Sequence, residues 1–240
     1  VREYSKRYSW IRCYTRTRVA GQSYYGSNVY AIQEGYEQIR TEPFKYLAIL
    51  DADISLPKMY YEDLLSKFEA DPKLGIASGV YLDLVHGKLR KILNDRRSTP
   101  KALMVFRRAC FEDIGGLAPM KYGGEDTAAC FTARMKGWKV WSFPDLTAIH
   151  NKPVGTGHGK SLVQIRFRQG IGEYFMATDP LFLILKSLRR CFLERPYVIG
   201  GIVRMIGYLC GWLKWEPRQI SLQLIKYIRR EQMQRIYNRN

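Results

Sequence analysis

The sequence predicts an α/β protein in which a sheet is flanked by helices and followed by a helical extension that is both basic and apolar. Two observations lead to this prediction: short apolar runs of strand length alternate with segments of helical spacing, and residues 186–240 differ in charge from those before them. With 46% hydrophobic and 25% charged residues, the chain is neither mainly disordered, collagen-like nor a disulfide scaffold. Its 240 residues suffice for one α/β domain with an appendage.

The expected strands and helices follow one another along the first 150 residues. Residues 46–50 are continuously apolar, as in a buried parallel strand, whereas Pro57 suits the first turn of a helix and Gly137 suits a helix end. In order, the pattern predicts a helix near 28–39, a strand over 46–50, a helix from 57 to about 68, a strand over 74–80, a hairpin turn at His86-Gly87, a strand over 102–106, a helix over 125–135 and strands over 138–143 and 146–149.

The net charge of +17 is concentrated toward the C-terminal end. Residues 46–150 carry 15 basic and 13 acidic side chains, whereas residues 186–240 carry 12 basic and 3 acidic ones. Such an excess favours an anionic partner, whether nucleic acid, a membrane surface or a phosphorylated substrate. The five cysteines form no C-x-x-C pair, so we expect neither a disulfide framework nor a cysteine zinc site, and a reducing compartment is the simpler expectation.

The tail contains two strongly apolar stretches, residues 181–185 and 198–212, each flanked by Lys or Arg. A spanning helix needs about 20 apolar residues, and Arg204 within the second stretch would cost about 2.5–3.5 kcal/mol at a bilayer centre. We therefore expect helices that lie in the membrane interface, or alternatively a helical subdomain packed on the core. A third segment has the apolar and basic faces of an amphipathic helix, formed by Ile220, Leu224, Ile225 and Ile228 and by Lys226, Arg229, Arg230 and Arg235.

Two acidic residues, Asp51 and Asp53, directly follow the first apolar strand. Open α/β sheets bind ligands at the carboxyl ends of their strands. Mg²⁺ and Mn²⁺ take oxygen ligands and are commonly held by one or two carboxylates together with substrate phosphates. The pair is therefore a candidate clamp for a metal and a diphosphate, although Asp after a strand is also an ordinary turn residue.

A second acidic pair, Glu125 and Asp126, follows Gly123-Gly124 at the start of a predicted helix. Acidic residues in a first helical turn often serve only to complement the helix dipole. An ionised carboxylate that the glycines allow to approach a substrate hydroxyl could also accept its proton as a new bond forms.

Taken together, these motifs resemble the GT-A-type catalytic domain of glycosyltransferase family 2, as found in bacterial polysaccharide biosynthesis. The resemblance covers roughly residues 20–160 and rests on the strand that ends in Leu50-Asp-Ala-Asp53, the stretch Phe106-Arg-Arg-Ala-Cys-Phe-Glu-Asp-Ile-Gly-Gly-Leu117, the motif Gly123-Gly-Glu-Asp126 and the following helix with Arg134, Gly137 and Trp138. It implies a mixed, mainly parallel sheet and an inverting displacement of a nucleoside diphosphate from a nucleotide sugar by an acceptor hydroxyl.

The resemblance also implies roles for individual residues. Asp126 would be the general base and Glu125 would orient the acceptor. Asp53 would bind Mg²⁺ or Mn²⁺, Asp51 would lie by the nucleotide ribose, and His150 would be a further metal ligand, although a polar residue at a strand end explains it equally well.

Arg166 and Arg168 follow a glycine-rich loop over residues 155–159 and would bind the diphosphate of the nucleotide-diphosphate sugar, or else remain solvent-facing or membrane-facing charge.

Two departures from the family pattern refine the expectation. The Gln-x-x-Arg-Trp signature of processive synthases is absent, since Gln164 is followed by Ile165-Arg166-Phe167-Arg168, which favours transfer of a single sugar. Too few residues precede Asp51 for the family's N-terminal nucleotide-binding elements, because one βαβ unit needs about 30 residues. We therefore expect a catalytic domain over residues 1–160, incomplete at its N-terminus, and a membrane-associating helical region over residues 161–240.

The resulting hypothesis is a peripheral enzyme at the cytoplasmic face of the bacterial inner membrane that glycosylates a lipid-linked or glycan acceptor. Two alternatives stay open: a non-catalytic relative that binds a nucleotide sugar, and a nucleic-acid-binding module. The latter is disfavoured because no nucleic-acid fold signature accompanies its candidate surface of Tyr4, Tyr8, Trp10, Tyr14, Tyr24 and Tyr25 beside Arg2, Arg7, Arg12, Arg16 and Arg18.

Overall fold

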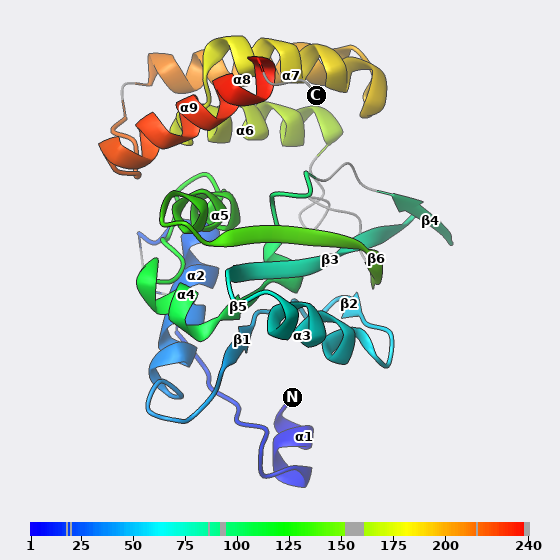
Figure 1. The fold of residues 1–240 in the computed structure, drawn as a ribbon. Coiled ribbons are helices and arrows are strands. Elements are labelled where there is room, and N and C mark those ends of the chain that lie inside the picture. Colours follow the sequence, from blue (N-terminus) through cyan, green and yellow to red (C-terminus); the bar gives the residue numbers. More distant parts are fainter. Residues whose placement is uncertain are drawn as a thin grey trace.

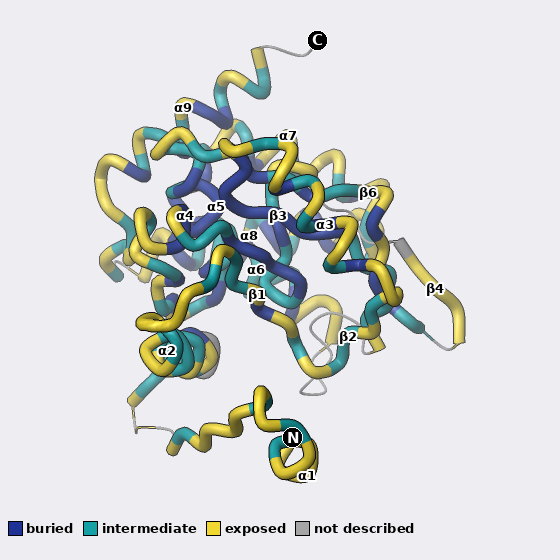
Figure 2. The backbone as a smooth tube through the Cα atoms, turned by 60° about the horizontal axis from the view of Figure 1, so that its bottom comes forward, coloured by how far each residue is buried: buried dark blue, intermediate teal, exposed yellow. Residues whose placement is uncertain are grey.

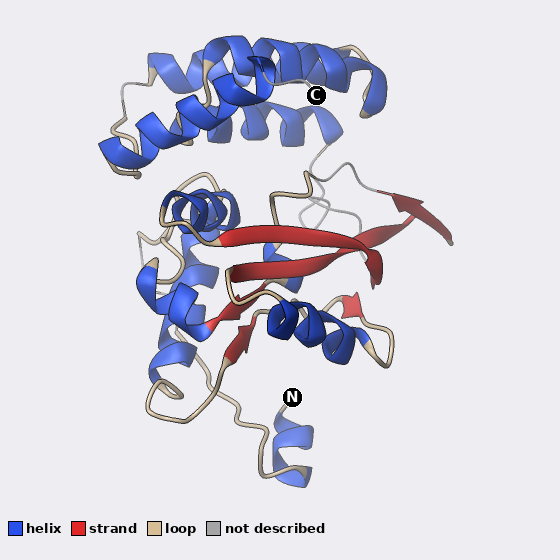
Figure 3. Ribbon diagram, viewed as in Figure 1, coloured by secondary structure: helices blue, strands red, loops and turns tan. Residues whose placement is uncertain are grey.

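The computed structural model describes residues 1–17, 19, 21–85, 87–91, 95–151, 161–214 and 216–237. Figures 1 and 3 show a central sheet with helices around it and a separate layer of helices beyond α5 and β6. The short N-terminal helix α1 (Arg2–Arg7) lies at the opposite end of the molecule from this layer.

The sheet runs in the order β1-β5-β3-β6-β2, and β4 pairs with the far end of β3. Among the described strands, only β3 and β6 pair in parallel, and the other pairings are antiparallel. The mixed α/β class is confirmed. The expectation of a mainly parallel sheet is wrong for these strands. Their one parallel pair, β3 and β6, is joined by a long crossover segment that contains α4 and α5. The strands are β1 (Tyr46–Ala48), β2 (Ile54–Ser55), β3 (Leu74–Val85), β4 (Lys88–Lys91), β5 (Val105–Arg107) and β6 (Lys139–His150).

Helices cover both faces of the sheet. On one face, α3 (Tyr60–Ala70) buries Tyr60, Leu64 and Phe68 against the strands. On the other face, α2 (Tyr24–Glu37), α4 (Arg108–Asp113) and α5 (Glu125–Met135) enclose a second apolar cluster around Phe106. Figure 2 shows the resulting buried centre along β3 and α5, with α1 and β4 exposed. This three-layer arrangement holds the strand ends and the start of α5 in fixed positions.

The helical layer consists of α6 (Leu162–Phe175), α7 (Pro180–Leu193), α8 (Ile199–Leu213) and α9 (Leu222–Tyr237). Within the described residues, no helix is both long and apolar enough to cross a membrane. The apolar stripe of α9 does not face outward: Leu224 and Ile228 pack with Ala128 and Phe131 of α5. The expectation that this stripe contacts a membrane is therefore corrected, because it forms part of the protein core.

Most predicted elements are confirmed with shifted boundaries, but the two strands expected over 138–143 and 146–149 are one strand, β6. The helix expected from Pro57 begins at Tyr60, and the strand expected over 102–106 is a 3₁₀ turn (Lys101–Leu103) followed by β5. Val85 pairs with Lys88, as the predicted hairpin requires, whereas His86 itself lies outside the described residues. The helix over 125–135 has the predicted bounds, and Gly137 adopts a φ of 89° just beyond it.

Candidate functional site

His150 lies between two carboxylates at the ends of three strands. It pairs with Asp83 across the parallel β3–β6 ladder and with Ile54 of β2 on its other side. Its Nδ1 is 2.8 Å from Oδ1 of Asp83, and its Nε2 is 3.6 Å from Oδ1 of Asp53. Because a carboxylate accepts hydrogen bonds, Asp83 favours the tautomer in which Nδ1 carries the proton and Nε2 presents its lone pair toward Asp53.

Backbone hydrogen bonds hold the segment that carries Asp51 and Asp53. The amide of Asp51 donates to the carbonyl of Ala102, at 3.2 Å, on the neighbouring connection. The carbonyl of Asp53 accepts from both the amide and the side-chain Nδ2 of Asn151, at 2.9 and 3.0 Å. This leaves the carboxylate of Asp53, about one-third exposed, facing His150.

The second acidic pair begins α5. Gly124 precedes the helix in the left-handed region, with φ 102°, a conformation that glycine adopts without strain. Asp126 accepts a hydrogen bond from the amide of Thr127 at 2.7 Å, whereas Glu125 is buried and lies 3.2 Å from Nζ of Lys101. Burial and the charge of Glu125 raise the pKa of Asp126, and the Thr127 amide and Lys101 oppose this rise.

Tyr81 connects the two acidic pairs. Its ring meets the imidazole of His150 edge to face, with 5.2 Å between the ring centres. Burial raises the pKa of Tyr81, and the charges of Asp83, Asp126 and Asp51 raise it further. Tyr81 therefore packs against His150 and is subject to the negative charge of three carboxylates: Asp51 after β1, Asp83 of β3 and Asp126 of α5.

The residues around His150 fit a divalent cation that shares its coordination with substrate. Asp53 and Nε2 of His150 offer one oxygen and one nitrogen from converging sides. Among the described residues, no three His, Cys, Asp or Glu side chains form a cluster that would hold a metal alone. One or two protein carboxylates are common where phosphate oxygens and water complete the coordination of such a cation, and His150 would add an imidazole nitrogen.

The two predicted arginines differ in their surroundings. Arg166 donates through Nε and Nη2 to the carbonyl of Arg195 and through Nη1 to Gln169, so its guanidinium is engaged within the helical layer. Arg168 donates to the carbonyl of Tyr122, at 3.3 Å, two residues before Gly124. Of the two arginines, only Arg168 therefore contacts the segment that leads into α5. The glycine-rich loop over residues 155–159, which precedes both, lies outside the described residues.

Sequence reasoning missed three residues of this region: Asp83, Tyr81 and Lys101. Asp83 and Tyr81 are two positions apart on β3 and therefore share a face of the sheet. A carboxylate within an otherwise apolar strand was the available signal for Asp83, because buried acids require partners. Lys101 had no comparable signal, since its partner Glu125 lies 24 positions further along the chain.

No protein-family model and no curated protein sequence matches the chain. Among solved structures, the chain is similar to the mannosyltransferase PcManGT from Pyrobaculum calidifontis, which was solved with GDP-Man and Mn²⁺: 14% identity, a TM-score of 0.52, and coverage of 99% of this chain and 67% of the other. A structure of GalNAc-T7 with UDP, GalNAc and Mn²⁺ aligns with 13% identity and a TM-score of 0.48 over 85% of this chain and 40% of the other. The chain therefore has the fold of GT-A-type glycosyltransferases.

Proposed function

We propose that this protein is an inverting, metal-dependent glycosyltransferase that moves one sugar from a nucleotide-diphosphate sugar to an acceptor hydroxyl. The observation that supports this most directly is the position of His150, between Asp53 and Asp83 and against the ring of Tyr81, within a GT-A-type fold. The mannosyltransferase of similar fold was solved with a nucleotide sugar and Mn²⁺, which is consistent with a donor and a cation of that kind.

In the proposed reaction, the acceptor oxygen bonds to the anomeric carbon while the bond from that carbon to the diphosphate breaks, and the diphosphate leaves with the electron pair. Asp126 accepts the hydroxyl proton. Glu125, buried and paired with Lys101, fixes the first turn of α5 and so positions Asp126. Asp53 and His150 would hold the cation, which when bound neutralises charge on the departing diphosphate.

The acceptor and the location are further parts of the proposal. The similarity of the motifs to family 2 favours a lipid-linked or glycan acceptor in bacterial polysaccharide synthesis, at the cytoplasmic face of the inner membrane. The candidate nucleic-acid surface receives less support, because Arg12 and Arg16 form ion pairs with Glu42 and Glu34 at 2.5 and 2.6 Å.

The test is release of nucleoside diphosphate from a panel of nucleotide sugars by the purified protein, with and without Mn²⁺. Asp126→Asn should lower turnover by about 10²–10⁴-fold, the usual contribution of a general base, while donor binding persists. Glu37→Gln, at an exposed acid on α2, is the matched control and should leave turnover unchanged. Donor binding without turnover in the unmodified protein would instead identify a non-catalytic nucleotide-sugar-binding relative.

A further inference from the structure

The packed helices α7 and α8 expose many large apolar side chains, here called the apolar plate. The two helices pack against each other on the outer side of the helical layer, and α6 lies between them and the rest of the protein (Figure 1). A soluble monomer rarely exposes so many large apolar side chains on adjoining helices. The exposed members are Leu181, Ile184, Leu185, Leu188, Phe192 and Leu193 of α7, and Ile199, Ile202, Ile206, Leu209, Trp212 and Leu213 of α8.

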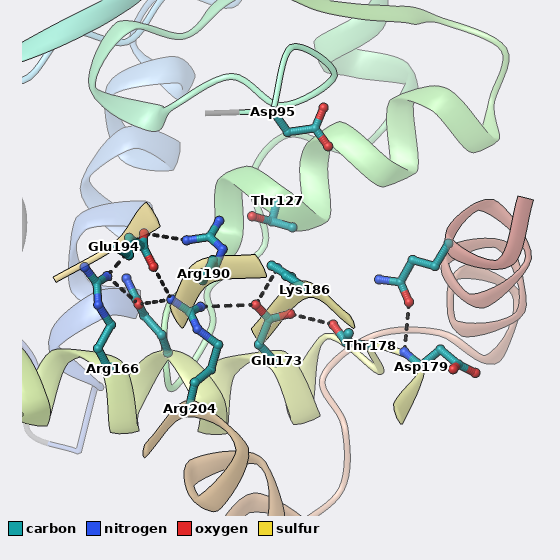
Figure 4. Close-up of polar contacts among 12 residues, drawn as sticks. Asp95, Thr127, Arg166, Glu173, Thr178, Asp179, Lys186, Arg190, Glu194 and Arg204 are labelled. Atoms are coloured by element: carbon teal, nitrogen blue, oxygen red, sulfur yellow. Dashed lines mark hydrogen bonds and ion pairs between the residues drawn. The ribbon is translucent and has the colours of Figure 1, made fainter. Parts of the chain in front are cut away.

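The interior of the same layer contains a charged network beside an apolar cluster that includes Leu183 of α7 and Tyr208 of α8. Glu173 of α6 lies 2.5 Å from Nζ of Lys186 and 3.5 Å from Nη1 of Arg204, and it accepts a hydrogen bond from Thr178 (Figure 4). Arg204, only 3% exposed, also reaches Glu194 at 3.0 Å. Helical bundles in water usually keep charged side chains outside and large apolar side chains inside, so the combination of a buried charged network with many exposed apolar residues on α7 and α8 departs from that pattern.

Glycines explain why the large side chains of α8 point outward. A Cβ atom at Gly207 of α8 would lie 2.1 Å from the carbonyl oxygen of Phe167, and one at Gly170 of α6 would lie 2.0 Å from that of Arg204. The backbones of α6 and α8 therefore approach too closely for larger residues between them. Packing through small residues, with apolar side chains turned outward, is the arrangement of helices in contact with lipid.

The charge around the plate is of one sign. None of the five acidic residues between 161 and 237 is exposed: Glu173, Asp179, Glu194, Glu216 and Glu231. By contrast, Arg189 and Arg195 are exposed beside the plate, and Lys226 and Arg230 are exposed on α9. Basic side chains near an anionic lipid surface are attracted to it.

We propose that the apolar plate inserts into the interfacial region of an anionic bilayer, with α7 and α8 lying in the membrane plane. The charge favours lipid over a second copy of the chain, because Arg189 and Arg195 beside the plate are both basic, so a second copy seated there would add like charges and no exposed acidic partner from α7 or α8. This inference goes beyond the proposed transfer reaction and rests on different residues. Arg168 of α6 donates a hydrogen bond to the carbonyl of Tyr122, shortly before Gly124 and Asp126. In the proposed orientation, the helical layer would therefore separate Asp126 from the lipid.

The experiment is flotation of the purified protein with vesicles of phosphatidylcholine alone or mixed with phosphatidylglycerol. The unmodified protein should float with the anionic vesicles, and salt should weaken this binding. Leu188→Glu and Ile202→Glu should each lower the apparent affinity about tenfold or more, as expected from loss of one buried large side chain. Arg189→Gln with Arg195→Gln should reduce the preference for anionic lipid.

The matched control is Leu89→Glu, at an equally exposed leucine on β4, which should float like the unmodified protein. Asp126→Asn should also float normally, so that loss of transfer and loss of attachment are separable. If a glutamate variant fails to fold by circular dichroism, Leu188→Gln and Ile202→Gln replace it. Absence of flotation, or equal flotation of the plate variants, overturns the proposal, as does a dimer that Leu188→Glu dissociates.

Discussion

Asp83 on β3 holds Nδ1 of His150 at 2.8 Å, so that the opposite edge of the imidazole faces Asp53. The two residues are direct partners in the parallel ladder, and both are largely buried. A second carboxylate behind a metal-binding histidine fixes both its ring orientation and its tautomer. The proposed cation site therefore depends on a residue that would not itself touch the cation.

Asp83→Asn should weaken Mn²⁺ binding about 10–100-fold, the usual effect of removing such a partner from a ligating histidine. The amide preserves the volume of the side chain but offers Nδ1 a weaker acceptor. Titration calorimetry with Mn²⁺ measures the effect independently of turnover. Asp63→Asn, on the exposed side of α3, serves as the control, and equal Mn²⁺ affinity of all three proteins would exclude the positioning role.

As the pH is lowered, the transfer activity should begin to fall at a pH above the pKa of an ordinary aspartate. Burial and the neighbouring Glu125 raise the pKa of Asp126, so this base becomes protonated, and inactive, earlier as the pH is lowered. Lys101 lowers that pKa, and Lys101→Met should therefore move the acid limb of kcat/KM to still higher pH. If Lys101→Met leaves the acid limb of the kcat/KM profile at the same pH, a group other than Asp126 controls that limb.

The protein should become less stable as the pH falls from about 4.5 to about 2, because protonation of Glu173 removes its ion pairs. Burial alone would raise the pKa of Glu173, but Lys186 and Arg204 hold it at about 2. The Glu173 carboxylate binds a proton less readily in the folded protein than in the unfolded chain. Its stabilising effect is therefore complete at pH values above its pKa in the unfolded chain, and it is lost as the pH falls to its pKa in the folded protein. Urea unfolding at several pH values measures it.

Glu173→Gln is the corresponding substitution. It should lower the free energy of unfolding at neutral pH by about 3–5 kcal/mol, since it leaves buried cations without their counter-charge. It should also remove this part of the acid dependence. Glu34→Gln, in an exposed ion pair with Arg16, should cost about 0–1 kcal/mol. A Glu173→Gln protein as stable as the unmodified one would show that the network does not stabilise the fold.

Gly207→Ala should destabilise the helical layer, because the new methyl group would overlap the carbonyl of Phe167. The expected loss is about 1–3 kcal/mol or more, as for overpacked cores, measured by thermal or urea unfolding. Gly35→Ala provides the opposite control: a Cβ atom at this helical glycine would have no other atom within 4 Å, and the change should stabilise α2 by about 0.5–1 kcal/mol. Equal stability of the two variants would contradict the close approach of α6 and α8.

The features that sequence predicted well are local ones. Asp51 and Asp53 follow an apolar strand, and Glu125 and Asp126 follow two glycines at a helix start, so strand length and turn chemistry were enough to single them out. The position of His150 beside Asp83 and Tyr81 depends on how β3 and β6 align. No local pattern specifies that alignment, which is why Asp83 was not anticipated as the partner of His150.

The tail illustrates the same limit. An apolar stripe with basic neighbours is the pattern of α9 and is equally compatible with a lipid surface and a protein core. Tertiary packing resolves the ambiguity for α9, since Ile228 is fully buried beside α5. Likewise, Arg204 within the apolar stretch of α8 pairs with Glu173 of α6 and with Glu194 at the end of α7, and so becomes part of a buried ionic network.

The return of α9 onto α5 has a practical consequence for anyone wishing to reduce the exposed apolar area of this protein. Arg134 of α5 pairs with Glu231 at 2.8 Å, and Ile228 fills the space beside Phe131, so deleting the C-terminal helix would expose the back of the helix that begins with Glu125 and Asp126. Replacing outward leucines and isoleucines of α7 and α8 with polar residues leaves that support untouched. Resurfacing, rather than truncation, is the route that the architecture allows.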